Sequence, residues 1–448
     1  MRKLLALFPP HPEPTLSTHW QVTQLSLILL PFSPLLGGVT LFVNSVVLWT
    51  KYANQLVQRL ANQVLLLLGA WMIIIALFAD RKDFSLPGLF NFLPFFIACI
   101  AQSFLFQDGR QLRQLARLII IPSLPIAILA VAQLWFGLTF NWKILSIGGG
   151  DGLILDWVLH PQGEPAGRAS SLFYYATILA SYLVITFTLT LGLWIEAIVQ
   201  SPKSEESPKR GFFHSRLGLG FVLVINGLAL VLTQSRNAWG VAVGEVAVFA
   251  FVMGHRWVVA AISAGVVAVL EAAYAPPPLN LWFRMIVPRA IWARINDEMF
   301  ANRPPALMRV NQWKFTIDLI HRRPLTGWGL RNFTPLYESA HHIYLGHPHN
   351  LPLMLASEMG IPATLIFYTL IGTVLAQSIL HIRSRSGDEP EVRSRLMILL
   401  AFLGCTAFSF FDVPIFDSRI NLFGWMLLSA LWGLQQKGRP NTVDRPLA

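Results

Sequence analysis

Long apolar runs, separated by short polar clusters, are the dominant pattern of this chain. Six runs without Asp, Glu, Lys or Arg reach the roughly 20 residues that a helix needs to cross a bilayer, and they cover 60–79, 84–107, 118–142, 169–195, 217–235 and 359–382. Four weaker runs are shorter or interrupted, and they cover 237–254, 257–274, 396–411 and 420–436. The pattern predicts a bundle of membrane-spanning helices.

The start of the chain has two readings. Residues 14–50 carry no acidic or basic side chain, but Pro31 and Pro34 fall in the middle of this stretch. Proline in a helix interior removes a backbone hydrogen bond, so the stretch forms either one kinked helix or two helices in a hairpin. The total is therefore eleven or twelve spans. The short apolar segment LLALF near residue 1 is too short for the apolar part of a cleaved signal.

Composition supports a membrane protein. Of the 448 residues, 54% are hydrophobic and 13% are charged, which is about half the charged share of an ordinary soluble domain. The two cysteines, Cys99 and Cys405, fall inside predicted spans and indicate neither a disulfide framework nor a metal cluster. We therefore expect an all-α polytopic membrane protein with about 11–12 transmembrane helices.

Basic loops indicate how the chain is oriented, because Lys and Arg near helix ends resist translocation. The segments 200–216 and 383–395 and the tail are basic and are assigned to the inside, which places the long segment between Ala275 and His349 outside. We therefore expect four parts: an N-terminal transmembrane bundle (1–274), a long outer loop (275–349), C-terminal transmembrane helices (350–436) and a cytoplasmic tail (437–448).

The outer loop carries nine basic and four acidic residues, a net charge of about +5. Loops longer than about 60 residues translocate largely regardless of charge, so the orientation stands and the charge predicts an anionic partner. Residues 308–321 place Trp313, Phe315 and Leu319 among polar positions, as an amphipathic helix on the membrane surface does.

Three residues on the outer side are candidates for chemistry: Arg236, Arg309 and His349. Two guanidinium groups can hold a pyrophosphate while negative charge builds on it, and a neutral imidazole can take a proton from an acceptor hydroxyl. Each of these residues could instead have a purely structural role. Arg236 is otherwise a membrane-interface anchor, Arg309 a solvated loop arginine, and His349 a loop histidine bound to water or backbone.

Two further features stay open. Glu245 lies within a predicted span, where an ionisable side chain is costly and has either a structural or a proton-related role. His347 and the pair His341–His342 lie close to His349 in sequence, but no carboxylate or cysteine spacing supports a metal site there.

The segments LTQSRNAWGVAVG, MRVNQWKFTIDLIHRRPLTGWGLRNF and HPHNLPLMLASEMGIPATLIF follow one another in this order between about 231 and 367. In these motifs the chain resembles the O-antigen ligase and polymerase superfamily of bacterial membrane glycosyltransferases. Arg236 matches the Ser-Arg motif of that family, Arg309 its loop-helix arginine and His349 the His of its His-Asn pair. Arg303 and Arg331 compete with Arg309 for the same role.

The resemblance implies a ligase-like enzyme at the periplasmic face of the bacterial inner membrane. The donor would be a glycan on undecaprenyl pyrophosphate, and the acceptor a hydroxyl of lipid A-core or a similar glycolipid. His349 would act as the base, and Arg236, Arg309, Arg303 and Arg331 would bind the pyrophosphate. The reaction would be inverting and would need no metal or other cofactor. Besides donor, acceptor and membrane lipids, no nucleic acid partner is expected.

Two alternatives remain at the level of sequence. An O-antigen or exopolysaccharide polymerase differs only in its acceptor, and no residue here separates the two activities. The segment FSFFDVPIFD, followed by Arg419, is similar to cyanobacterial O-antigen ligase-like relatives that have been discussed in inorganic-carbon transport, so a bicarbonate or small-anion transporter is the alternative of another class. The sequence shows no internal repeat or pair of broken helices of the kind that secondary transporters have.

Overall fold

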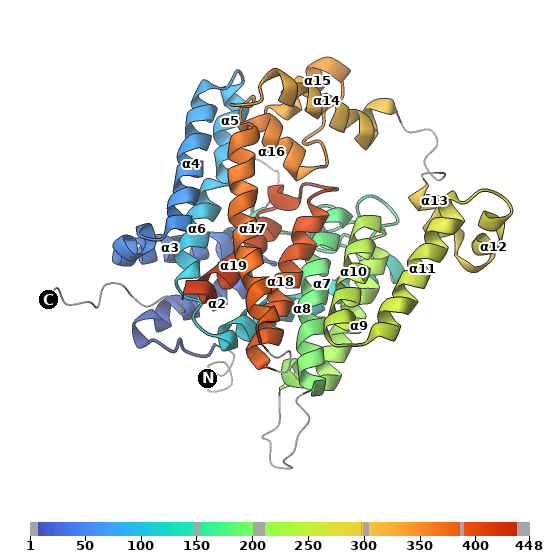
Figure 1. The fold of residues 1–448 in the computed structure, drawn as a ribbon, viewed down its shortest axis with the longest axis horizontal. Helices are drawn as coiled ribbons and strands as arrows, with labels where there is room; N and C mark the ends of the chain where they lie inside the picture. Colours follow the sequence, from blue (N-terminus) through green and yellow to red (C-terminus); the bar gives the residue numbers. More distant parts are fainter. Residues whose placement is uncertain are drawn as a thin grey trace, which may run out of the picture.

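The computed structural model describes residues 8–146, 152–199, 211–296, 298, 304–385 and 389–436. Within these residues it is a helical bundle with one small β-hairpin, and a group of short helices covers one end of the bundle (Figure 1). The predicted all-α polytopic membrane protein is confirmed. Arg303 and the tail 437–448 lie outside the described residues.

The first half of the described chain forms long helices, short connecting helices and two strands. In order they are η1 (Pro14–Leu16), α2 (Ser17–Leu29), α3 (Pro34–Val57), α4 (Leu60–Phe78), α5 (Lys82–Gly88), η2 (Leu89–Asn91), α6 (Leu93–Ser103), α7 (Gly109–Trp135), β1 (Phe140–Ser146), β2 (Gly152–Leu159) and α8 (Ala176–Val199).

The second half contains the elements that match the three motifs. In order they are η3 (Phe212–His214), α9 (Arg216–Leu232), α10 (Arg236–Val252), α11 (Arg256–Tyr274), α12 (Leu279–Ile286), α13 (Arg289–Ile295), η5 (Pro305–Leu307), α14 (Arg309–Arg322), α15 (Phe333–His341), α16 (Leu351–Met359), α17 (Ile361–Arg383), α18 (Pro390–Phe408), η6 (Pro414–Phe416) and α19 (Ser418–Gln436).

Helices α2 and α3 form a hairpin, which decides between the two readings of residues 14–50. The Ser33 side chain accepts a hydrogen bond from the Leu36 backbone N–H and caps α3, and Pro34 occupies the first turn, where its missing N–H costs nothing. The buried Asn44 of α3 reaches back to His19 and Thr23 of α2. These contacts hold the two helices side by side.

Helix α8 forms the centre of the bundle and packs against α7, α9, α10 and α18. Seven helical segments of the described chain are long and apolar enough to cross a membrane, and they are 34–57, 60–78, 82–103, 109–135, 176–199, 256–274 and 361–383. The expected spans α9, α10, α18 and α19 are shorter or less apolar and pack within the same bundle. The count of eleven or twelve spans therefore stays a prediction.

Two sequence expectations differ from the structure. The run 84–107 is not one helix, because the backbone leaves helical geometry at Phe92 between η2 and α6. The run 118–142 ends as a helix at Trp135, and residues 140–146 and 152–159 pair as the antiparallel strands β1 and β2. Hydropathy alone does not distinguish a short apolar strand from the end of an apolar helix, so the hairpin was not predicted.

A glycine with a positive φ connects the short helix α16 to the long helix α17. Gly360 separates α16 from α17 at φ +85° and ψ 159°, a conformation that is open essentially only to glycine. The Ile361 N–H donates to the Pro324 carbonyl, and the Trp328 and Gly329 N–H groups donate to the Ser357 and Glu358 carbonyls. The turn after α14 is thereby fixed against the end of α16.

Replacing Gly360 by Ala should destabilise the protein. A Cβ at this position would collide with the Leu325 carbonyl oxygen, and the backbone strain alone costs roughly 1–3 kcal/mol. We expect a clearly lower midpoint of thermal unfolding in detergent. Gly372→Ala in α17 is the matched control, because a Cβ there meets nothing within 4 Å and should leave the midpoint unchanged or slightly higher. Equal midpoints for the two variants would contradict the structural role of Gly360.

Candidate functional site

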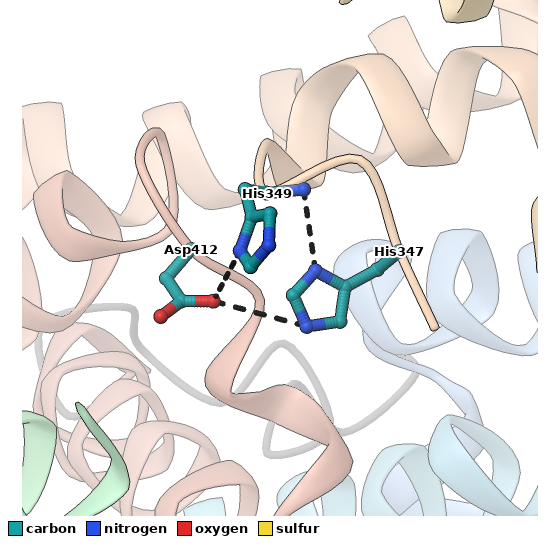
Figure 2. Close-up of side chains that lie close together, drawn as sticks. All are labelled: His347, His349 and Asp412. Atoms are coloured by element: carbon teal, nitrogen blue, oxygen red, sulfur yellow. Dashed lines mark hydrogen bonds and ion pairs between the residues drawn. The ribbon is translucent and has the colours of Figure 1, made fainter. Parts of the chain in front are cut away.

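His349 and Asp412 come from distant parts of the chain and form a hydrogen-bonded pair (Figure 2). His349 Nδ1 lies 3.1 Å from Asp412 Oδ1, and His347 Nε2 lies 3.8 Å from the same oxygen. The segment that carries the two histidines is held in place because Asn350 caps α16 and donates to the Phe410 carbonyl. The loop between α18 and α19 supplies the carboxylate.

The hydrogen bonds fix where each imidazole carries its proton. The His349 backbone N–H donates to His347 Nδ1 over 3.2 Å, so a neutral His347 carries its proton on Nε2, the atom that faces Asp412. An ionised carboxylate only accepts hydrogen bonds, so His349 donates from Nδ1. This leaves His349 Nε2 with a lone pair that is not used by Asp412.

The surroundings keep His347 neutral and Asp412 ionised. Burial lowers the pKa of His347 to about 4, and the nearby cations Arg331 and Arg309 act in the same direction. Burial by itself would raise the pKa of Asp412, but the hydrogen bond from His349 and the charges of the two histidines outweigh it and lower that pKa to about 2. At neutral pH Asp412 is therefore the anion of the site.

Five arginines line the pocket in which these residues lie, a cavity of about 940 Å³. They come from the loop before α8, the first residue of α10, helix α13, the first residue of α14 and the turn before α15, and they are Arg168, Arg236, Arg294, Arg309 and Arg331. We call this cavity the arginine pocket. His347, His349 and Asp412 also line it.

Two of these arginines donate hydrogen bonds to the sharp turn between α9 and α10. Arg168 Nε donates to the Thr233 carbonyl over 2.8 Å, and Arg294 donates to both the backbone and the side-chain oxygen of Gln234. Gln234 has φ +51°. Burial lowers the pKa of Arg168 and of Arg294, and the positive charge of Arg236 lowers both further. These cations repel one another, so the pocket favours an anion.

Among the remaining three arginines, an aromatic contact places Arg331, and a hydrogen bond of Trp313 places the helix that carries Arg309. The Arg331 guanidinium lies over the Phe416 ring at 4.2 Å, and His347 stacks on the same ring at 5.7 Å. Arg309 begins α14, and Trp313 one turn later donates to the Pro348 carbonyl beside the histidines. Helix α14 therefore carries its first arginine toward the same pocket.

The structure brings together most of the residues that the sequence singled out. Arg236, Arg309, Arg331 and His349 line one pocket, whereas Arg303 lies outside the described residues. His349 precedes α16 at φ +51° and does not open it, because the capping residue is Asn350. Glu245 lies elsewhere, buried in the bundle, where it accepts a hydrogen bond from Thr188.

Sequence reasoning missed four residues of the pocket: Arg168, Arg294, His347 as a partner of Asp412, and Asp412 itself. The segment FSFFDVPIFD was noticed, but nothing local ties its aspartate to a histidine that lies 63 positions earlier. Arg168 stands in a polar loop and Arg294 among many basic residues. A tertiary contact was needed to identify each of them.

The trio of His347, His349 and Asp412 has the composition of a metal site, and one ligand atom of each lies within 4.8 Å of the others. A metal ion at this site would have to displace the imidazole protons that face Asp412. The contact between His349 and Asp412 is that of a hydrogen-bonded acid–base pair, and a site without a metal stays a prediction.

The partly buried, neutral His347 should make the protein sensitive to acid. In the unfolded chain this histidine protonates near pH 6.5, but the folded protein resists protonation until about pH 4. The unfolded state thus binds more protons in this window, and stability falls as the pH drops through it. We expect His347→Gln to flatten the fall of the thermal midpoint between pH 6.5 and pH 4. His321→Gln, an exposed position on α14, is the control and should behave like the wild type.

Comparison with known proteins agrees with this geometry. Residues 221–368 match the family model described as O-antigen ligase, and this range contains Arg236, Arg294, Arg309, Arg331 and both histidines of the pocket. A search of curated proteins gives no match. The matched range includes the three motifs on which the resemblance was based, so the predicted resemblance of this multi-pass membrane protein to the O-antigen ligase superfamily is confirmed over these residues.

Proposed function

We propose that this protein transfers a glycan from a polyprenyl-pyrophosphate donor to a hydroxyl group of an acceptor, by a single inverting displacement. One observation carries the proposal: a histidine paired with a partly buried aspartate lies in the same pocket as five arginines. The arginines suit the pyrophosphate, and the histidine suits the hydroxyl. The match to the O-antigen ligase family supports the same reaction class.

In the proposed step, His349 Nε2 removes the proton of the acceptor hydroxyl. The freed oxygen lone pair attacks the anomeric carbon of the donor, and a new carbon–oxygen bond forms on the face opposite the leaving group. The bond between the anomeric carbon and the pyrophosphate oxygen breaks, and its electron pair stays on that oxygen. The proton remains on His349 until it is released to water.

The arginines stabilise the charge that develops on the departing pyrophosphate. Guanidinium groups bind phosphate oxygens with two parallel hydrogen bonds, and in a site shielded from water such preorganised donors lower the barrier substantially. Repulsion among Arg168, Arg236 and Arg294 is present before the donor arrives. Binding of the anionic group relieves this repulsion, and the relief is largest when the negative charge is largest.

Asp412 acts as a positioning residue for the base. It holds the proton of His349 on Nδ1 and stabilises the positively charged imidazolium that forms when Nε2 takes up the acceptor proton. His347 faces the same carboxylate and stacks on Phe416. It therefore keeps Asp412 in place without competing for the acceptor.

Replacing His349 by Ala should lower the turnover number for transfer by about 10²–10⁴-fold, which is the usual contribution of a general base, and the KM for the donor should change little. Asp412→Asn should lower the turnover number in the same direction and change its pH profile, because an amide no longer stabilises the imidazolium. The measurement is transfer from purified lipid-linked donor in proteoliposomes. His321→Ala is the control, and full activity of His349→Ala would refute the assignment of the base.

The reaction should also be independent of divalent metal ions, because His347 Nδ1 and His349 Nδ1 each take part in a hydrogen bond within the protein. We expect the same transfer rate before and after dialysis against EDTA, and no gain on adding Zn²⁺ or Mg²⁺. A rate that collapses with EDTA and returns with one of these ions would show that a metal takes part.

The residues of the arginine pocket do not identify the acceptor. A ligase uses a hydroxyl of lipid A-core or a similar glycolipid, and a polymerase uses a second lipid-linked repeat unit. Both need the same base and the same cations. The basic loop and the orientation derived from the short basic segments favour a periplasmic active face in the bacterial inner membrane.

A further inference from the structure

Helices α11, α12 and α13 form a small unit at the edge of the bundle (Figure 1). The unit has a core of its own, in which Phe283 of α12 and Trp292 of α13 pack against the last turns of α11. Helix α11 is long and apolar enough to cross a membrane, yet little of it is buried inside the protein. The unit therefore borders lipid along α11.

Exposed aromatic side chains mark the two ends of α11. Trp257 lies at its start and Tyr274 at its end, roughly 25 Å apart along the helix axis at 1.5 Å per residue. Trp and Tyr gather at both boundaries of a bilayer, so Tyr274 marks the level of one boundary. Helix α10 begins at Arg236 in the arginine pocket, and α11 returns beside it. This boundary is therefore the one on the side of the pocket.

Helix α12 follows shortly after this boundary and exposes an apolar surface. Trp282, Met285 and Ile286 are exposed over 68%, 85% and 78% of their surface, and Leu281 is exposed beside them. At 3.6 residues per turn these four residues share one side of the helix, and we call this side the α12 face. Large apolar side chains that gather on a surface mark a contact with another apolar phase.

Polar side chains of the unit are bound to the end of α11 and not to the α12 face. Arg284, the one charged residue of α12, donates to the Ala272 carbonyl over 2.9 Å and lies over the Trp292 ring at 3.8 Å. Asn296 donates to the Ala273 carbonyl over 3.2 Å. Carbonyls in the last turn of a helix have no partner within that helix. These bonds therefore tie α12 and α13 to the last turn of α11, at the membrane boundary.

Lipid suits the α12 face better than a second protein does. The face follows directly on the exposed apolar side chains of α11, among them Val267 and Leu270, so the chain passes from one apolar surface to the next. No charged side chain belongs to the face, whereas Trp282 is a residue type that lies at the level of lipid headgroups. A short helix with one apolar side and one polar side lies in the membrane interface with its apolar side chains below the headgroups.

We propose that the α12 face is a lipid-binding surface, whose four side chains insert into the leaflet on the side of the arginine pocket. Helix α13 is tied to the same turn of α11 and carries Arg294, which donates to the Gln234 carbonyl in the arginine pocket. The lipid contact thus holds Arg294 at the level of the pocket. Insertion of the face does not depend on the proposed reaction, because the face lies outside that pocket.

Spin labels test what surrounds the face in proteoliposomes. Met285→Cys and Ile286→Cys each place one label on the face, in a protein whose Cys99 and Cys405 are replaced by Ala, and Ser339→Cys on the exposed side of α15 is the control. Oxygen concentrates in hydrocarbon, whereas a charged nickel chelate stays in water. We expect the ratio of oxygen to nickel collisions to be several-fold higher at 285 and 286 than at 339. Thermal unfolding verifies that each variant is folded.

Equal ratios at all three positions would overturn the lipid contact. Labels at 285 and 286 that neither agent reaches would also overturn it, because another protein would then cover the face. A charge placed on the face gives a second measure. Ile286→Glu, introduced beside the label at 285, should lower the ratio toward that at 339, because a carboxylate in hydrocarbon is costly. Ser339→Glu is the matched control and should leave the ratio at 285 unchanged, and an equally unchanged ratio in Ile286→Glu would contradict the insertion.

Binding of inorganic pyrophosphate, measured by calorimetry in the same proteoliposomes, tests the link to Arg294. Ile286→Glu should weaken this binding several-fold, because α13 is no longer held by the lipid contact, whereas Ser339→Glu should bind like the wild type. Wild-type affinity in Ile286→Glu would overturn the role of the face in holding Arg294. If the wild type binds no pyrophosphate while the labels at 285 and 286 report lipid, the proposed function fails and the lipid-binding surface stands.

Discussion

The hydrogen bond between His349 and Asp412 is the contact on which the organisation of the site depends. It joins the loop before α16 to the loop between α18 and α19, two segments that are far apart in the chain. The carboxylate stays ionised because the imidazole protons point at it, and this fixes the proton of His349 on Nδ1. Without this contact the His349 imidazole would lose the hydrogen bond that orients it.

Cations that repel one another are the second constraint. Arg168 and Arg294 are kept close to Arg236 by hydrogen bonds to the backbone and side chain of the α9–α10 turn, and Arg331 by the Phe416 ring. Backbone carbonyls and an aromatic ring stabilise these guanidinium groups, but they are neutral groups and leave the positive charge in place. The site is thus preorganised for an anion. The surrounding bundle holds the arginines together despite their mutual repulsion.

The sequence by itself determined the class of the protein and most of its helices, because an apolar run of about 20 residues in lipid satisfies its backbone only as a helix. It also singled out Arg236, Arg309, Arg331 and His349, since local motifs mark them. Only the tertiary structure decided that 14–50 is a hairpin, that residues 140–146 and 152–159 form strands, and that Asp412, His347, Arg168 and Arg294 line the candidate site. These depend on contacts between segments remote in the chain, and periodicity and hydropathy report only on neighbours along it.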